Sequence, residues 1–329
     1  MRLIGAMAGL CVVAIAVAGC GGSSNGGGGA GNSGSSGPVA DGGTFTFAMT
    51  SDPGNLDPQA SAASNLFQIS QFAYDHLVNP EANGKTSSGL ATSWQVSGAT
   101  VTMTMHKSVT CSDGSPFTAS DAAANLNYIA DPKNKSPFVG VFLPAGAHAT
   151  ASGDKLTITS PKAAPFVLDG LANIPMVCAK GMQNRKTLAQ HTDGTGPYQL
   201  SQAVASDHYT YTKRKGYTWG PGGATTATKG MPDKIVVKII ANETTAANLL
   251  LSGGLNAATV VGADAARLEA AHLFSASTSA VYGEMWFNQG NGRPGADPAM
   301  RHALTDALDL SQLEKVLTSN RGSSASVSA

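Results

Sequence analysis

Alternating apolar and polar residues predict a series of short strands along this chain, and apolar residues spaced three and four positions apart predict helices between them. The strands are expected at 44–47, 101–105, 156–159, 195–200, 209–212, 235–240 and 281–287. The helices are expected at 65–78, 118–129, 244–251, 298–308 and 311–317.

The clearest buried strand is the β-branched run IVVKII at 235–240. A helical pattern follows at 244–251, and after Gly253 and Gly254 the chain returns to apolar residues at 255–258. A strand, a helix and a second strand in this order form the unit of a parallel sheet. The pattern therefore predicts an α/β fold with parallel strands.

The link at 111–121 contains turn and cap residues. Thr118 and Asp121 lie three residues apart, which is the spacing of a capping box at the start of a helix. Asp113 lies in a Gly- and Pro-containing turn before it. We therefore interpret Asp113 and Asp121 as turn and cap residues rather than as ligands.

The first residues have the pattern of a signal peptide. Arg2 is followed by an apolar and small-residue run at 3–17, which is too short for a comfortable transmembrane helix. The run ends in VAGC at 17–20 and resembles the bacterial lipobox, in which the cysteine receives a lipid and becomes the N-terminus. We expect a signal peptide at 1–19 and a lipid on Cys20. A plain secreted protein with a chance cysteine is the alternative.

Residues 21–43 consist almost wholly of Gly, Ser, Asn and Ala. Such a segment contains no apolar cluster that can pack, so we expect a flexible linker. A coil of this length spans roughly 26 Å on average. With Cys20 it would tether a folded body to a membrane, outside the cytoplasm.

Charge and motifs exclude several classes of protein. Lys and Arg number 21, as do Asp and Glu, and no basic run occurs, so nucleic acid is not expected as a partner. The sequence has no G-x-S-x-G elbow, since its G-x-S-x-G match at 22–26 lies in the Gly- and Ser-rich segment and not between a strand and a helix, and the motifs H-E-x-x-H and C-x-x-C are absent. We expect no catalytic residue, cofactor or metal. The alternative that stays open is a metal site, formed where two of the scattered histidines meet in the fold.

Two cysteines remain for the body of the protein. Cys11 would leave with the signal peptide and Cys20 would carry the lipid, which leaves Cys111 and Cys178 in an oxidising compartment. We expect a disulfide between them that stabilises the fold by about 4 kcal/mol. Two free buried thiols are the alternative.

Several motifs occur in an order that resembles one known family. They are DPGNLDP at 52–58, LATSW at 90–94, SDGSPFTASD at 112–121, GTGPY at 194–198, NETTAANLLLSG at 242–253, and WFN at 286–288 with DPAMRHALTDALD at 297–309. Together they resemble the extracytoplasmic solute-binding proteins of ABC importers, in the dipeptide/oligopeptide-binding family (family 5). The resemblance covers about 44–317.

The resemblance implies a two-lobed, periplasmic-binding-protein-like (type II) α/β fold. The first lobe is expected at 44–280 with an inserted subdomain at about 66–165, and the second lobe is expected to begin at 281–329. Cys111 replaces an aromatic residue of the family motif, and Asn256 replaces an Asp. Family members continue well past the helix at 298–308, so we expect the second lobe of this chain to be incomplete.

The resemblance also implies a function without catalysis. The protein would capture a peptide or similar small solute between its lobes as a monomer, and deliver it to separate permease and ATPase subunits. In that case Asp52 pairs with a ligand amine, while Tyr282 and Trp286 form apolar walls, although Trp286 is an equally good core residue. The expected ligand contacts are Ser51, Asp52, Pro53, Tyr282, Gly283 and Trp286.

Two other functions remain open at this point. A surface lipoprotein with a structural or signalling role could keep the fold without transport. A chain that lacks half of the cleft could also have no function.

Overall fold

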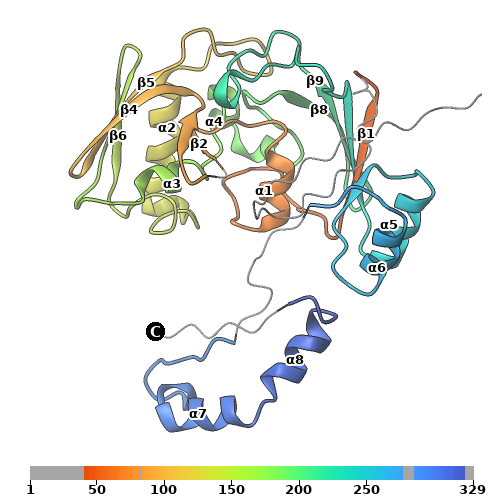
Figure 1. Cartoon of the computed structure of the whole chain (residues 1–329). Coiled ribbons are helices and arrows are strands. Elements are labelled where there is room, and N and C mark those ends of the chain that lie inside the picture. Colours follow the sequence, from red (N-terminus) through yellow and green to blue (C-terminus); the bar gives the residue numbers. More distant parts are fainter. Residues whose placement is uncertain (1–40, 82, 277–284, 323–329) are drawn as a thin grey trace, which may run out of the picture.

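The computed structural model describes residues 41–81, 83–276 and 285–322. Two larger sheets, of five and four strands, form the body of the molecule, and a two-stranded hairpin lies between them (Figure 1). Each larger sheet has its own cluster of buried apolar side chains. Val78 of the hairpin belongs to the cluster of the four-stranded sheet.

The five-stranded sheet contains both parallel and antiparallel pairs. Its strands, in order across the sheet, are β11 (Ala257–Ala258), β1 (Thr44–Met49), β10 (Lys234–Ile239), β9 (His208–Lys213) and β8 (Tyr198–Val204). β1 pairs in parallel with β10 and with β11. β10 and β11 run in the same direction because α5 (Glu243–Leu251) carries the chain from the end of β10 back to the start of β11. The predicted α/β fold with parallel strands is confirmed.

The four-stranded sheet is antiparallel throughout. Its order is β4 (Ala91–Ser97), β5 (Thr100–Met105), β7 (Lys155–Thr159) and β6 (His148–Ser152). Val101, Met103 and Met105 of β5 are buried, as their alternation with polar residues predicts. α2 (Ala119–Ala130) packs against β6 and β7 and buries Leu126 and Ile129.

The capping box at the start of α2 is present. The Asp121 carboxylate accepts a hydrogen bond from the Thr118 backbone N–H at 2.7 Å, and the Thr118 hydroxyl accepts one from the Asp121 N–H at 3.4 Å. Nearby, the Asp113 carboxylate accepts from the Ser115 N–H at 3.0 Å, which closes a turn. The prediction that these two acids shape the backbone is confirmed.

The helix expected at 65–78 is wrong beyond Ser70. α1 (Ser64–Ser70) ends there, and the chain becomes extended before the hairpin of β2 (Val78–Pro80) and β3 (Thr86–Ser88). The carbonyl oxygens of Phe72 and Ala73 accept from the N–H groups of Tyr198 (2.9 Å) and Gly196 (3.0 Å). The apolar residues at helical spacing are therefore buried against a distant segment of the chain, and not on one face of a longer helix.

Glycine permits that contact. A Cβ on Gly194 would lie 2.3 Å from the Ala73 carbonyl oxygen, and a Cβ on Gly196 would lie 2.5 Å from the Ala73 carbonyl carbon. Two backbones approach this closely only where a side chain is missing. The GTGPY block therefore serves packing, and it delays the strand expected at 195–200 until Tyr198.

The remaining short helices of the body are α3 (Val167–Leu171), α4 (Ala179–Gln183) and α6 (Asp264–Ala270). A disulfide joins Cys111 to Cys178, which directly precedes α4. Both cysteines are buried, so the predicted bridge is present inside the core that surrounds α2.

The LDP motif forms a buried ion pair. The Arg185 guanidinium donates to both oxygens of the Asp57 carboxylate and to Gln59 Oε1 at 3.1 Å. It also lies over the ring of Tyr128, 4.0 Å from the centroid. The Gln59 amide in turn donates to Asn125 Oδ1 on α2 at 2.7 Å. The motif therefore links the two cores.

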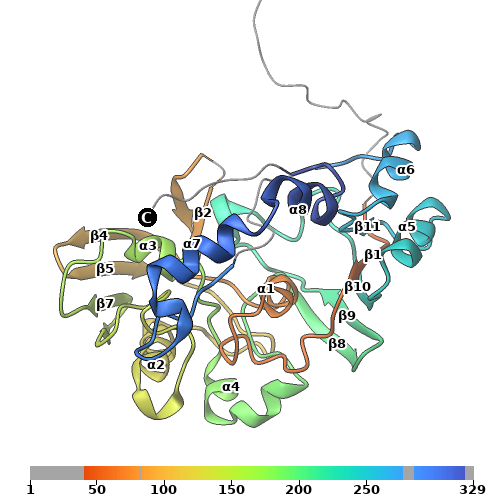
Figure 2. The same ribbon diagram turned by 90° about the horizontal axis from the view of Figure 1, so that it is seen from below.

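The last described segment lies outside this body, below it in Figure 1 and in front of it in Figure 2. It contains α7 (Pro298–Asp306) and α8 (Leu310–Leu317), close to the helices predicted there, and neither buries a residue within the described chain. Residues 285–287 form no strand, so the strand expected at 281–287 is wrong for these residues, whereas 281–284 lie outside the described residues.

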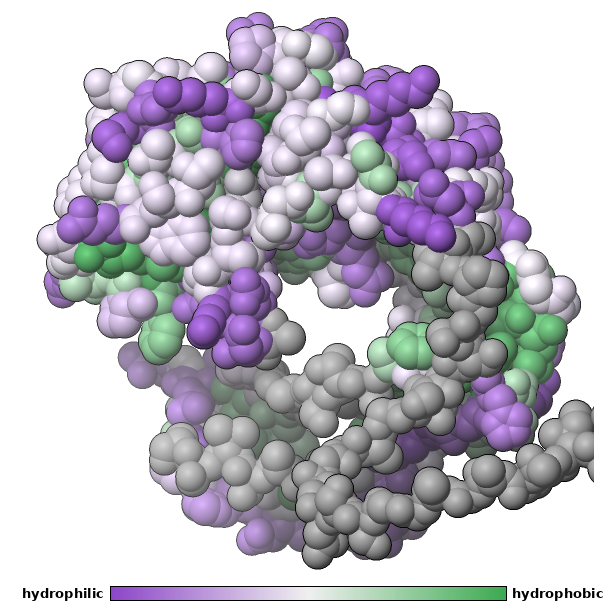
Figure 3. Space-filling model, turned by 45° about the horizontal axis from the view of Figure 1, so that its top comes forward, coloured by the Kyte–Doolittle hydropathy of each residue, from purple (hydrophilic) through white to green (hydrophobic). Residues whose placement is uncertain are grey.

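The visible surface of the body is mostly polar or neutral (Figure 3). Apolar residues show at its left and right edges (Figure 3). In and around α5 and α6, Leu251, Val261, Leu273 and Phe274 are exposed. Across the described ranges, no helix combines the length and apolar character needed to cross a bilayer.

Candidate functional site

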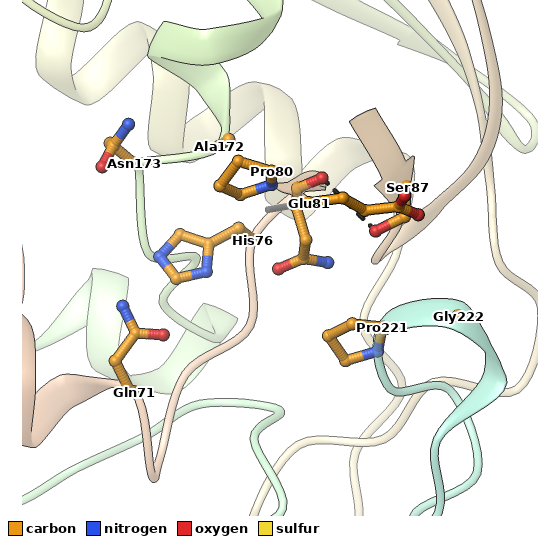
Figure 4. A pocket seen from close by; sticks show the side chains of 10 residues that line it. Gln71, His76, Pro80, Glu81, Ser87, Ala172, Asn173, Pro221 and Gly222 are labelled. Carbon is orange, nitrogen blue, oxygen red and sulfur yellow. Dashed lines mark hydrogen bonds between the residues drawn. The ribbon is translucent and has the colours of Figure 1, made fainter. Parts of the chain in front are cut away.

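A cavity of about 540 Å³ opens between the hairpin, the end of α1, the end of α3 and the loop at 221–222 (Figure 4). Its walls combine polar and apolar surface in about equal shares. They are formed by Gln71, His76, Asn79, Pro80, Glu81, Ser87, Ala172, Asn173, Pro221 and Gly222. Segments more than a hundred residues apart in sequence therefore share one pocket.

His76 forms the buried wall of this cavity. Its side chain comes from the extended segment before β2, and the residue is only 5% exposed. Burial lowers the pKa of the imidazole to about 4, so the ring is neutral at pH 7. In the described part of the chain, its Nε2 atom has no hydrogen-bond partner. A buried polar atom without a partner is uncommon and calls for an explanation.

Two asparagines that line the cavity use their amide nitrogens in hydrogen bonds to the backbone. Asn79 Nδ2 donates to the Ser88 carbonyl at 3.0 Å, and Asn173 Nδ2 donates to the Asp169 carbonyl at 2.8 Å. Both amide nitrogens are thus engaged by the backbone, which fixes the side chains and leaves their Oδ1 atoms as acceptors.

Glu81 is the one formally charged residue among those that line the cavity. Its Oε2 accepts from the Asn83 amide at 3.0 Å, and the residue is exposed at the end of β2. The cavity wall therefore carries a formal charge of −1. Among the described residues, no three His, Cys, Asp or Glu side chains come together as metal ligands.

A buried carboxylate holds the back of the cavity in place. Asp75 accepts hydrogen bonds from the Thr195 hydroxyl (2.8 Å), the Tyr217 hydroxyl (2.8 Å) and the Trp219 indole N–H (3.0 Å). Burial raises the pKa of Asp75, and these hydrogen bonds and the Arg214 charge oppose that rise. The network fixes the loop that carries Pro221 beside the segment that carries His76.

The predicted contact Asp52 lies elsewhere. Its carboxylate accepts from the Gly54 N–H at 2.6 Å, from the Ser206 N–H, and from the Tyr209 hydroxyl at 2.8 and 2.9 Å. Burial raises the pKa of Asp52, but the hydrogen bonds of Ser206, Gly54 and Tyr209 outweigh it, so that the pKa is lowered. The ionised carboxylate is thus already engaged inside the protein.

The other predicted contacts are not brought together in the described chain. The Ser51 hydroxyl accepts from the Asn65 amide at 3.3 Å, and the Pro53 carbonyl accepts from the Asn55 N–H at 2.8 Å. Trp286 is 84% exposed and belongs to no described core. Tyr282, Gly283 and Cys20 lie outside the described residues. Their roles in binding and anchoring stay predictions.

The sequence profile of the bacterial extracellular solute-binding proteins, family 5 (middle), matches residues 85–328. The chain belongs to this family. Family 5 membership agrees with the resemblance of the ordered motifs between LDP and the helix at 298–308. The structure explains two of those motifs, because LDP provides the ion pair between the cores and GTGPY packs on the segment before His76.

Two curated relatives illustrate the similarity. The glutathione-binding protein GsiB of Escherichia coli O1:K1 is 27% identical over 292 residues, which cover 84% of this chain and 53% of that protein. The probable deoxycholate-binding periplasmic protein YgiS of Escherichia coli (strain K12) is 30% identical over 127 residues, or 37% of this chain and 24% of that protein. The chain therefore spans about half the length of GsiB, and its match to YgiS covers about a quarter of that protein.

Solved structures share the fold. A substrate binding protein from Microbacterium hydrocarbonoxydans, complexed with 4-hydroxybenzoate hydrazide, superposes with a TM-score of 0.72 at 27% identity, covering 85% of this chain and 59% of that one. The unliganded open form of the murein tripeptide binding protein MppA gives 0.63 at 21% identity, covering 86% and 58%. The fold is therefore the α/β, type II periplasmic-binding-protein fold.

Proposed function

We propose that this chain is the extracytoplasmic solute-binding component of an ABC importer, and that it captures a peptide or similar small polar solute. Family 5 membership is the observation that carries the proposal. The cavity beside His76 supports it, because a solute site needs a concave wall of apolar surface with a few fixed hydrogen-bonding groups. We infer a role in binding rather than in catalysis, with delivery to separate permease and ATPase subunits.

We further propose that residues 44–280 form a first lobe with an inserted subdomain at about 66–165, and that 281–329 belong to the second. The four-stranded sheet supports the insertion, since its strands all lie between Ala91 and Thr159 and share a core with α2. Closure of two such lobes on a solute is the usual motion of periplasmic binding proteins.

Membrane attachment through Cys20 is part of the same proposal. The VAGC sequence at 17–20 and the Gly- and Ser-rich linker support it. Metabolic labelling with a fatty-acid probe in a bacterial host should mark the wild-type chain and leave Cys20→Ser unlabelled. Equal labelling of both chains would place the lipid elsewhere.

Thermal-shift screening of the processed chain with a library of di- and tripeptides tests whether the captured solute is a peptide. We expect at least one peptide to raise the midpoint of unfolding in a concentration-dependent manner, because a ligand that binds only the folded state stabilises it by mass action. A library of sugars is the matched control. A response to sugars alone, or to neither library, would contradict peptide capture by this chain.

A further inference from the structure

Two large apolar side chains are exposed on neighbouring loops beside α3. Phe166, directly before α3, is 79% exposed, and Val141 is 68% exposed. In the described part of the body, Phe274 on the other side of the molecule is the other large apolar side chain with such an exposure, at 78%. Exposed apolar residues that gather on one surface mark a contact with another molecule or with a membrane.

The loop that carries Val141 packs against α3. A Cβ on Gly170 of α3 would lie 2.1 Å from the Phe142 carbonyl oxygen, so the two backbones are in contact. The Phe142 ring packs on the core and meets the fully buried Phe138 edge-on, with the ring centroids 5.2 Å apart. Val141 and Phe166 are therefore held at the surface by neighbours that are anchored in the core.

The two loops, at 132–143 and 160–166, are basic. They contain no Asp or Glu and three exposed lysines, which are Lys133, Lys135 and Lys162. Asp131 and Asp169 flank the loops, and the Asp131 carboxylate accepts from the Lys133 backbone N–H at 2.9 Å. The surface keeps a net positive charge when both acids are counted. The three lysines with Val141 and Phe166 are named the α3 surface below.

The exposed apolar residues around α6 have a different charge environment. Arg267 pairs with Asp264 at 2.8 Å, and Arg321 pairs with Glu269 at 2.9 Å. In contrast, the salt bridges within the described ranges include none of the three lysines of the α3 surface. Unpaired positive charge therefore accompanies exposed apolar side chains at α3 and not at α6.

This combination of side chains suits an anionic lipid bilayer. Apolar side chains enter the boundary between headgroups and acyl chains, while lysines attract the negative headgroups. The linker at 21–43 is long enough for such a contact, since a chain of that length reaches at most roughly 80 Å and a body of this size is about 45 Å across. A tether also raises the local concentration of lipid, so that a weak contact is sufficient.

We propose that the α3 surface binds an anionic lipid bilayer, with Val141 and Phe166 inserted at the level of the headgroups. The proposal rests on the proposed function, because the lipid on Cys20 is what brings the body to a membrane. It adds an orientation to that attachment. The side of the four-stranded sheet, where α3 lies at the left of Figure 1, faces the lipid, whereas α5 and α6 at the right face away from it.

Vesicle binding tests the proposal with a chain that cannot carry the lipid. The processed chain with Cys20→Ser is mixed with vesicles of phosphatidylcholine alone, or of phosphatidylcholine and phosphatidylglycerol in equal parts, and cosedimentation measures the bound fraction. We expect binding to the anionic vesicles to be at least about tenfold stronger and to weaken as sodium chloride is added, because each lysine near an anionic surface contributes about fivefold. Equal binding to both vesicles, or binding to neither, would overturn the proposal.

Two variants and a matched control separate the apolar and charged parts of the surface. Val141→Ser/Phe166→Ser should weaken binding to the anionic vesicles about tenfold, because the inserted apolar area is lost. Replacing the three lysines by glutamine should remove the preference for anionic vesicles. Phe274→Ser is the control, since Phe274 is equally exposed but has no unpaired lysines around it, and it should bind like wild type.

Circular dichroism checks that each variant is folded, as substitutions of exposed side chains should leave it. A loss of vesicle binding in Phe274→Ser as large as that in the double variant would contradict the proposal. So would full binding by the variant without the three lysines.

The outcome is independent of lipid labelling and of the peptide screen. If the anionic vesicles bind the unlipidated chain while Cys20 takes up no fatty acid in the host, the α3 surface stands and the anchor is wrong. If Cys20 is labelled, or a peptide binds, while the vesicles do not bind, the proposed function stands and the α3 surface is wrong.

Discussion

At the scale of single residues, the polar groups of greatest consequence are buried ones. His76 was not a candidate from the sequence, because its neighbours in the cavity come from residues 79–87, 172–173 and 221–222. Asp52 was a candidate from the sequence, and its carboxylate already accepts hydrogen bonds from Tyr209, Ser206 and Gly54. Residue type shows which groups carry charge. The fold decides which of these groups still have an unpaired hydrogen-bond donor or acceptor.

His76 makes the stability of the protein depend on pH. Its pKa is about 4 in the folded protein and 6.5 when exposed, so the unfolded chain binds the proton more readily between these values. Stability is therefore fully present above about pH 6.5 and is lost as the pH falls toward 4. From pH 7 to pH 5 the expected contribution of His76 is a loss of about 2 kcal/mol.

Urea unfolding of wild type and His76→Gln at pH 7 and pH 5 measures this contribution. Asp75 acts in the opposite direction, because burial raises its pKa and protonation there favours the folded state. The difference between the two proteins isolates His76, since Asp75 is present in both. Equal losses of stability in both proteins between the two pH values would show that the imidazole is not buried in its neutral form.

At the scale of elements, local signals in the sequence predicted most helices and strands. The alternation in β5, the β-branched run of β10 and the capping box of α2 each depend on residues within one element. The end of α1 could not be predicted in this way. The segment after Ser70 gives its backbone carbonyls to Gly196 and Tyr198, about 120 residues later in the chain, and this contact overrides the helical spacing.

The disulfide is the strongest single link between elements. It closes a loop with a sequence separation of 67 and joins the turn before α2 to the start of α4. The double variant Cys111→Ala/Cys178→Ala should lose about 4 kcal/mol of unfolding free energy, because the unfolded chain regains the entropy of the opened loop. Guanidinium unfolding measures the loss. Reductant should lower the midpoint of wild type toward that of the variant and leave the variant unchanged, and a variant as stable as wild type would contradict the bridge.

At the scale of the whole molecule, the body and the α7/α8 segment are unequal parts. α7 and α8 bury no residue of their own in the described chain, and Arg321 reaches the body through an exposed ion pair with Glu269 at 2.9 Å. Such a pair contributes little to stability. The apolar side chains of these helices, including Leu304, Leu308 and Leu313, are exposed.

A chain that ends at residue 276 should therefore be as stable as the longer one, within about 0.5 kcal/mol, because the removed helices share no core with the body. Chemical unfolding compares the two. A chain that ends at residue 252 is the control, and it should be clearly less stable because it lacks β11 at the edge of the five-stranded sheet. A loss of more than about 2 kcal/mol on removing 277–329 would show that α7 and α8 pack on the body.

The sequence by itself determined the α/β class, most of the elements, the cysteine pair and, through ordered motifs, the family. These depend on periodicity, caps and residue order, which are local properties of a chain. The tertiary structure decided where α1 ends, which carboxylates are already engaged, and that His76, Asn173 and Pro221 share a cavity. The physical reason is burial. Whether a polar atom keeps a free lone pair depends on donors that the fold brings from distant segments, and no local pattern records them.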